Sequence, residues 1–119
     1  AQVLHPSLPD SPGHLHWKAL CDPQGTGTLG KGAGLFSVLV DTRFKQAQVD
    51  AFCDALKLFK LGYSWGGPMS LVVPYNLAQM RPDWPTHLKR GTLVRFSAGL
   101  ESAGDLIADL TQATESALR

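Results

Sequence analysis

The chain has 119 residues, which is enough for one domain with a buried core. Hydrophobic residues make up 44% and charged residues 18%, a composition that excludes a disordered chain. The formal charge of +1 excludes a protein that binds nucleic acid or a membrane surface by bulk charge, and no apolar run is long enough to span a bilayer.

Residues 1–34 contain four prolines and are predicted to be mostly loop. Within them, residues 3–5 suit a short edge strand, and residues 14–20 suit two turns of helix. Residues 35–40 form a short apolar run with β-branched side chains, which predicts a buried strand.

The next predicted element is a helix over residues 46–58, followed over 60–67 by a strand end that turns. A strand over 70–73 is expected to stop at Pro74, because proline lacks the N–H that a strand ladder uses. One face of the helix carries apolar residues at spacings of three and four, namely Val49, Phe52, Cys53 and Leu56.

Residues 77–90 carry two prolines and cannot form one regular element. A strand is predicted over 92–98 and a final helix over 103–118. Ser102 is the expected N-cap of that helix, and Asp105 would complete a variant of the capping box. The helix should pack on the sheet through a stripe of Leu106, Leu110, Ala113 and Ala117, widened by Ile107.

This order of strands and helices predicts an α/β fold, of the α+β two-layer sandwich kind. We expect a short, mostly antiparallel sheet with helices on one face. Residues 1–34 would form a loop-rich connection, and residues 35–119 the core of the sandwich.

The two cysteines, Cys21 and Cys53, allow one disulfide bridge but do not require it. Cys53 falls on the apolar side of a predicted helix and is interpreted as a small core residue. No fourth ligand stands near His14, His16 and Cys21, so no metal site is predicted. The first residues lack the basic and apolar regions of a signal peptide, and we expect a reduced, cytoplasmic protein.

Residues 25–30 read Gly-Thr-Gly-Thr-Leu-Gly and, with Lys31, resemble the loops that cradle phosphate groups. Such a loop follows a strand and opens a helix, whereas here a proline-rich segment precedes it and a strand follows. Gly32 also stands where a phosphate-binding loop has Ser or Thr. The pattern therefore favours a flexible loop over a nucleotide site.

Arg95 is a charged residue within an apolar predicted strand. Alternation places it on one face with Leu93 and Ser97. Such a residue must pair with an acid, extend to water or bind an anion. A carboxylate would match the two-pronged geometry of a guanidinium. The pattern leaves open both an edge-strand or salt-bridged arginine and a ligand site.

The segment Tyr63-Ser64-Trp65-Gly66-Gly67 has two aromatic residues around a hydroxyl, followed by two glycines. Glycines permit close approach of the backbone to a ligand, Ser64 can donate to an anion, and Trp65 can wall a pocket. An ordinary turn with core aromatics is the alternative.

Several motifs follow one another along nearly the whole chain. They are Val3-x-His5-Pro6, Pro12-Gly13-His14, Gly34-Leu35-Phe36-Ser37, residues 58–67, Arg95-x-x-x-Gly99-Leu100-Glu101 and Asp105-Leu106-Ile107-x-Asp109-Leu110. Together these motifs resemble the pyridoxal-phosphate (PLP)-dependent enzymes of Cys/Met metabolism. Trp65 follows the β-lyase pattern in that family, where synthases and γ-lyases usually have leucine, and Pro68-Met69 departs from the family pattern.

The resemblance implies that residues 1–119 are the small C-terminal, substrate-binding domain of a fold-type I enzyme. It implies β-elimination at a carbon–sulfur bond of cystathionine, giving homocysteine, pyruvate and ammonia. Arg95, Ser64 and the backbone of Trp65 would bind the substrate α-carboxylate, with Tyr63 at the wall of the pocket.

PLP would be held mainly by a large domain of the same protein, because the family's Schiff-base lysine and cofactor-stacking aromatic have no match here. We therefore expect no catalytic residue in this chain and no activity of the chain alone. The implied partners are an amino-acid thioether, the large domain and, at full length, further copies in a homotetramer. The alternative is a non-catalytic α+β domain that binds small anions or another protein through the strand of Arg95.

Overall fold

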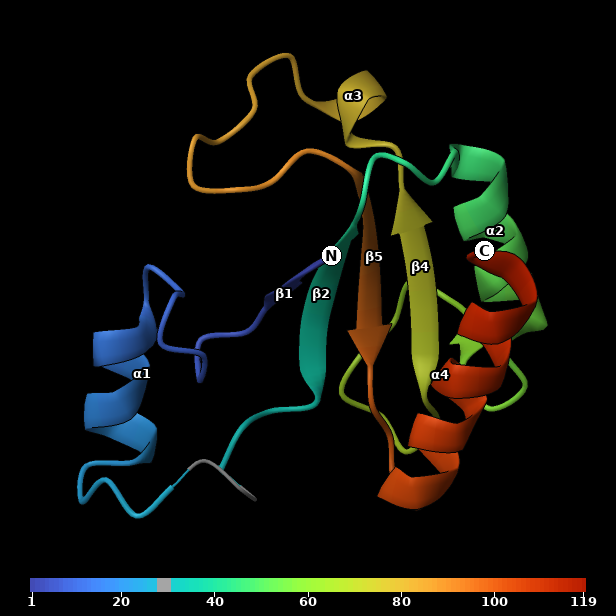
Figure 1. Ribbon diagram of the computed structural model, residues 1–119. Coiled ribbons are helices and arrows are strands. Elements are labelled where there is room, and N and C mark those ends of the chain that lie inside the picture. The colour runs from blue at the N-terminus through green and yellow to red at the C-terminus, as the bar shows by residue number, and fades with distance from the viewer. Residues whose placement is uncertain (28–30) are drawn as a thin grey trace.

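A computed structural model describes residues 1–27 and 31–119 (Figure 1). In this part of the chain, five strands form one sheet in the spatial order β1-β2-β5-β4-β3. The pairings are antiparallel except that β3 runs parallel to β4, which confirms the predicted, mostly antiparallel sheet. The strands are β1 (Gln2–Leu4), β2 (Leu35–Val40), β3 (Lys60–Leu61), β4 (Leu71–Tyr75) and β5 (Thr92–Ser97).

Helices α2 (Gln46–Ala55) and α4 (Ala103–Ala117) lie together on one face of the sheet, as Figure 1 shows. This arrangement confirms the predicted two-layer sandwich. Helix α1 (His14–Cys21) stands apart from the sheet and buries none of its side chains. Helix α3 (Leu77–Met80) is a short helix in the otherwise irregular segment between β4 and β5. None of the described helices is long and apolar enough to cross a membrane.

The core lies between the sheet and the helices α2 and α4. The ring of Phe96 on β5 stacks on Phe36, with ring centroids 5.1 Å apart, and meets Phe52 and Phe59 edge to face at 6.4 and 5.4 Å. Such aromatic pairs add stability beyond the area that they bury. Cys53 is buried in the same core, which confirms its predicted place, and burial raises the pKa of its thiol to about 12.

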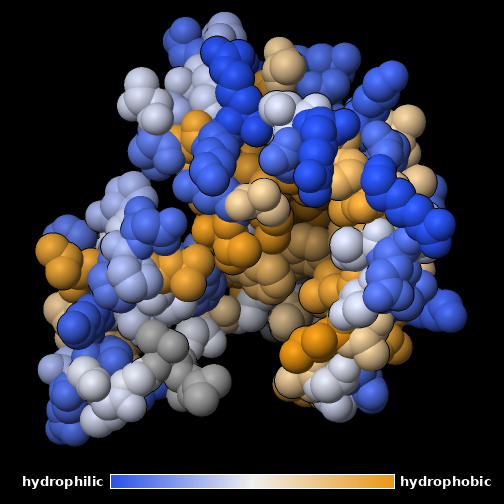
Figure 2. Space-filling view, in the orientation of Figure 1, coloured by the Kyte–Doolittle hydropathy of each residue, from blue (hydrophilic) through white to orange (hydrophobic). Residues whose placement is uncertain are grey.

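An apolar groove of about 370 Å³ remains beside α4. Figure 2 shows apolar side chains gathered over the middle of the molecule in this view. Helices α2 and α4 therefore leave part of their own side of the sheet uncovered. The groove is lined mainly by strand and helix residues, among them Phe36, Val38, Phe96, Leu110 and Leu118.

Helix α2 ends at Ala55, three residues before the predicted end. A carboxylate from α4 ends it, because Asp109 accepts the backbone N–H groups of Lys57 and Leu58 at 2.8 Å and of Phe59 at 3.3 Å. In a longer helix these N–H groups would bond to carbonyls four residues earlier. Here the chain instead turns toward β3.

The predicted stripe on α4 is partly right. Leu106 and Ala113 are buried, and Leu110 and Ala117 pack half-buried against the core. Ile107 does not widen the stripe, because its side chain is 64% exposed. It follows Leu106 directly, and one residue turns the helix by about 100°, which carries Ile107 away from the sheet. The buried place is taken instead by the polar Asp109.

The predicted capping box of α4 is wrong, because the Ser102 side chain makes no hydrogen bond to the start of the helix. Ser102 and Asp105 are both exposed, so water can satisfy the first helical N–H groups. A side-chain contact does begin α2, where Oε1 of Gln48 accepts the backbone N–H of Lys45 at 3.0 Å.

The prediction that Pro74 ends its strand is also wrong, because β4 continues through Pro74 to Tyr75. The carbonyl of Val72 accepts the N–H of Gly62, so the backbone polar groups of Val72 face β3. Pro74 lies two residues farther along β4, and its nitrogen therefore faces the same edge of the strand. Strand β3 ends at Leu61, opposite Val72. In the described part of the chain Pro74 therefore faces an open edge, where its missing N–H costs no ladder bond.

Asp109→Asn should destabilise the fold by at least about 2 kcal/mol, because an amide oxygen satisfies fewer of the three backbone N–H groups than a carboxylate does. Asp105→Asn is the matched control on the same helix, since Asp105 is exposed, and it should cost less than about 1 kcal/mol. Urea unfolding of the chain measures both. Equal losses in the two variants would contradict the role of Asp109.

The contribution of Asp109 should also depend on pH. Burial acts to raise the pKa of its carboxyl, but hydrogen bonds from Lys57, Leu58, Phe59 and Gln112 outweigh burial and hold that pKa below the ordinary value of 3.8. A lowered pKa gives stability that is complete above the ordinary value and is lost as the pH falls through the lowered one. The unmutated chain should be more stable than the Asp109→Asn variant, and this difference in unfolding free energy should shrink as the pH falls below about 4. A difference that stays constant under acid would refute this.

Candidate functional site

Arg95 lies on the sheet face that points away from α2 and α4. In β5, Val94 and Phe96 point into the core, so Arg95 shares the opposite face with Leu93 and Ser97. This confirms the predicted alternation. Strand β5 lies between β2 and β4, so the interpretation of Arg95 as an edge-strand residue is wrong.

The charge of Arg95 has no acidic partner among the residues that the structure describes, where the ion pair found is that of Lys31 with Asp22. The guanidinium donates to the backbone carbonyl of Tyr63 and lies 5.9 Å from the centroid of the Tyr75 ring. A guanidinium has five N–H donors, so one carbonyl cannot satisfy it. Arg95 is thus a half-buried cation with donors for an anion.

The segment between β3 and β4 brings Ser64 to the same face. The N–H of Gly66 donates to Oγ of Ser97 at 3.1 Å, and the carbonyl of Tyr63 accepts from Arg95. The backbone on both sides of Ser64 therefore lies over β5. Gly66 has a φ of +78°, in the left-handed region that favours glycine. The side chains of this segment are open to a ligand, since Tyr63, Ser64 and Trp65 are all exposed.

A buried polar cluster, to which sequence reasoning assigned no role, holds the end of this segment. Ser70 is fully buried. Its hydroxyl donates to Oε2 of Glu101 at 2.7 Å, its N–H donates to Oε1 at 3.0 Å, and its Oγ accepts the N–H of Gly99 at 2.8 Å. The Ser70 N–H and then its hydroxyl hold the pKa of Glu101 below the ordinary value of 4.5.

Pro68, where the sequence departs from the family pattern, is part of the same attachment. Its carbonyl accepts the N–H of Leu100 at 2.8 Å. The approach is close, because a Cβ on Gly99 would lie 2.2 Å from that carbonyl oxygen. Only glycine therefore fits at position 99 without a shift of the backbone.

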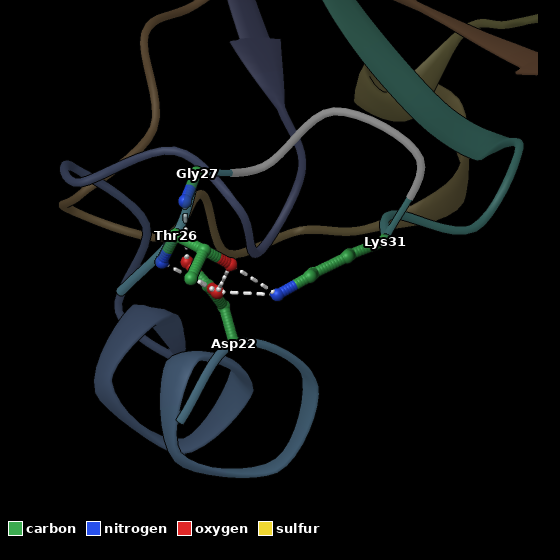
Figure 3. A network of polar contacts seen from close by, with 4 residues as sticks. All are labelled: Asp22, Thr26, Gly27 and Lys31. Carbon is green, nitrogen blue, oxygen red and sulfur yellow. Dashed lines mark hydrogen bonds and ion pairs between the residues drawn. The ribbon is translucent and has the colours of Figure 1, made fainter. Parts of the chain in front are cut away.

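The glycine-rich stretch that resembles a phosphate cradle surrounds a carboxylate instead (Figure 3). Asp22, which is buried, accepts the N–H groups of Thr26 at 3.1 Å and Gly27 at 3.2 Å. The Nζ of Lys31 lies 2.7 Å from the same carboxylate, and its hydrogen bond holds the pKa of Asp22 below the ordinary value. These donors are therefore taken up by Asp22. Residues 28–30 of the motif lie outside the described residues.

The residues that suggested a metal site do not form one. Nδ1 of His14 lies 3.0 Å from the carbonyl oxygen of Pro6, and the His14 ring stacks with Trp17. Cys21 is an exposed free thiol. Across residues 1–27 and 31–119, no three His, Cys, Asp or Glu side chains form a group that could hold a metal ion.

The lysines are on the surface. A lysine that forms a Schiff base needs an environment that lowers its pKa, such as an apolar pocket or a neighbouring cation. All six lysines belong to the described residues and are exposed, and one of them is paired with Asp22. They are Lys18, Lys31, Lys45, Lys57, Lys60 and Lys89.

An apolar cavity of about 250 Å³ lies beside Arg95, and sequence reasoning missed it. Its lining includes Ser37, the cross-strand partner of Arg95, and Leu93, its neighbour on the same face. Leu4 and the segment after β4, including Trp84, close the other sides. These walls come from parts of the chain that are distant in the sequence, so no local sequence pattern predicts the cavity.

Comparison with known proteins gives the context of this site. The chain is 42% identical to the cystathionine beta-lyase of Salmonella typhimurium over 92% of its own length and 26% of the relative's. It is 40% identical to that of Haemophilus influenzae, with 91% and 26% covered. It is also 34% identical to an L-alanine/L-glutamate racemase of Wolbachia pipientis, with 94% and 26% covered. The chain thus spans about a quarter of the length of these curated relatives.

The fold is found in solved structures as well. The crystal structure of metB from Corynebacterium glutamicum matches 98% of this chain and 28% of that chain, with a TM-score of 0.68 and 30% identity. A methionine gamma lyase from Micromonospora echinospora matches 95% and 26%, with a TM-score of 0.66 and 28% identity. The model of the family described as Cys/Met metabolism PLP-dependent enzyme matches residues 1–115, and the chain belongs to this family.

Proposed function

We propose that this chain is the substrate-binding part of a PLP-dependent carbon–sulfur lyase that acts on cystathionine. The overall reaction would be β-elimination, giving homocysteine, pyruvate and ammonia. The likeness to cystathionine beta-lyases at 39–42% identity supports this choice within the family. So does Trp65, which follows the β-lyase pattern.

Arg95 is the observation that carries the proposal. It is a half-buried cation without an acidic partner in the described part of the chain, and it stands beside the backbone that carries Ser64. Burial of an unpaired charge is unfavourable unless an anion joins it. Arg95, Ser64 and the backbone N–H of Trp65 would together bind the α-carboxylate of an amino acid, with Tyr63 at the pocket wall.

The apolar cavity beside Arg95 fits the remainder of such a substrate. A thioether chain is apolar, and Leu4, Leu93 and Trp84 give the cavity mainly apolar walls. The charged residues of the lining, Arg81 and Asp83, belong to the segment after β4. The site would then hold the substrate carboxylate at Arg95, while the thioether side chain of the substrate lies in the cavity. That placement would fix the orientation of the substrate α-carbon, which is how a binding domain contributes to the rate.

The lysines of this chain do not fit the Schiff-base position of a PLP site, because all six are exposed. The cofactor, which supplies an electron sink for reactions at the α-carbon, would be held by the large domain of the same protein. The uncovered apolar groove beside α4 supports such a packing partner, since large exposed apolar patches usually mark interaction sites.

The proposal extends to the setting of the domain. Residues 1–119 would be the C-terminal domain, with 1–34 as the connection and 35–119 as the sandwich core. The free thiols of Cys21 and Cys53 are in keeping with a reducing cytoplasm. A homotetramer at full length, and a place in methionine biosynthesis, rest on the family resemblance.

Arg95→Lys in the full-length protein should lower kcat/KM for cystathionine by about 30-fold to several thousand-fold, because an ammonium cannot reproduce the planar fork of a guanidinium. Ser64→Ala should cost less, since it removes one neutral donor. The matched control is Arg119→Gln, at an exposed arginine on the last residue of the chain, which should leave kcat/KM unchanged. Full activity of Arg95→Lys would rule out the carboxylate site.

The chain alone should not form a covalent adduct with PLP at one lysine. All six lysines are exposed, and exposed lysines react weakly and without preference, because they lack the apolar pocket that activates a Schiff-base lysine. The test is borohydride reduction after incubation with PLP, followed by peptide mapping. A single stoichiometric adduct, with release of pyruvate from cystathionine, would overturn this expectation.

A further inference from the structure

The segment that carries Ser64 is attached to β5 and its continuation at four successive points. Residues that come later in the segment contact residues that come later in β5 and its continuation. The two stretches of chain therefore run side by side in the same direction. The pairs are Tyr63 with Arg95, Gly66 with Ser97, Pro68 with Leu100, and Ser70 with Glu101. The attachment therefore extends from the guanidinium to the start of α4.

The last of these contacts is the most deeply buried and the most completely hydrogen-bonded. Every polar group of Ser70 is used, since its carbonyl also accepts the N–H of Lys60 at 3.0 Å. Both oxygens of Glu101 receive a hydrogen bond from Ser70, and bonds to a charged acceptor are the stronger kind. By contrast, residues 63–69 are all exposed and have no core of their own. Their position depends on the ends at which they are held.

We propose that Glu101 is a positioning residue for the carboxylate site, and that through Ser70 it sets where Ser64 and Trp65 stand relative to Arg95. This inference rests on the proposed function, because it concerns the same site. Glu101 would not touch the substrate. Glu101 would hold the Ser70 end of the segment. The Tyr63 end is held by Arg95, the residue that would bind the substrate.

The removal of Glu101 has a definite chemical consequence. It leaves the buried N–H of Ser70 without an acceptor, and such a group must find another partner or move. Movement of Ser70 would shift residues 63–69 along β5. A displacement of about 1 Å in a positioning contact can lower a rate or an affinity by about a hundredfold.

The test compares two inhibitors of the full-length enzyme that differ only in the carboxylate, L-alanine and ethylamine. In Glu101→Ala the inhibition constant of L-alanine should rise by about tenfold or more, while that of ethylamine stays within about twofold. A purely structural role would change both constants together or neither. Either of those results would overturn the proposal.

Two further variants keep the test decisive. Glu115→Ala removes an exposed glutamate from α4 with the same change in charge, and it should leave both inhibition constants as they are. Glu101→Gln keeps one oxygen for the Ser70 N–H but loses the acceptor of the Ser70 hydroxyl, so its inhibition constant for L-alanine should lie between those of the wild type and Glu101→Ala. If Glu101→Ala fails to fold, Glu101→Gln is compared with the wild type instead. Its inhibition constant should then rise by an intermediate amount for L-alanine and stay unchanged for ethylamine. No rise in that variant would overturn the proposal.

A separate measurement distinguishes failure of this inference from failure of the proposed function. If the wild-type protein has no lyase activity, the proposed function fails, but attachment of the segment can still be followed by amide hydrogen exchange. Exchange at Gly66 and Ser70 should then be faster in Glu101→Ala than in Glu115→Ala. Equal exchange in the two variants would show that Glu101 does not hold the segment.

Discussion

Strand β5 connects the core and the site, because its alternating side chains belong to both. The register that buries Val94 and Phe96 under the helices necessarily turns Arg95 and Ser97 to the other face. A slip of one residue would carry the guanidinium into the aromatic cluster around Phe96, where an unpaired charge is very unfavourable. Antiparallel partners on both sides, β2 and β4, hold that register. The packing of the core therefore determines where the cation of the site stands.

Two carboxylates, those of Asp109 and Glu101, each hold a segment of the chain in place by accepting hydrogen bonds from it. Asp109 accepts the N–H groups of a segment that leaves α2, and Glu101 accepts the backbone N–H and the hydroxyl of Ser70, just before β4. Each is an acidic group that holds a turn through hydrogen bonds that it accepts, and these bonds lower the pKa of each. The short strand β3 lies between the two turns. The route of the chain from α2 to β4 is thus held at both ends by negative charge, so acid weakens both attachments.

Local patterns were sufficient for much of the fold. The apolar spacing of α2, the β-branched run of β2 and the alternation in β5 are properties of neighbouring residues, and these elements lie where they were predicted. The early end of α2 could not be predicted in this way, because a distant residue causes it. Asp109 ends α2 from more than 50 positions away.

The site shows the same division. Arg95 and Ser64 stood out because a charge within an apolar strand and a hydroxyl before paired glycines are local anomalies. The residues that hold their segment, Ser97 and Glu101, contact it from 31 positions away, and neither has an unusual neighbourhood in the sequence. Family resemblance adds roles for the first two residues but not for the second two.

Pro74 has a consequence beyond the native sheet. The unpaired edge of a sheet offers N–H and C=O groups to which a strand of another molecule can bond. Here the two outer strands have only three and two residues, and past the end of β3 the exposed side of β4 presents a proline nitrogen. A foreign strand arriving at that edge finds no donor there. A residue that costs the native ladder nothing thus protects the chain against edge-to-edge aggregation.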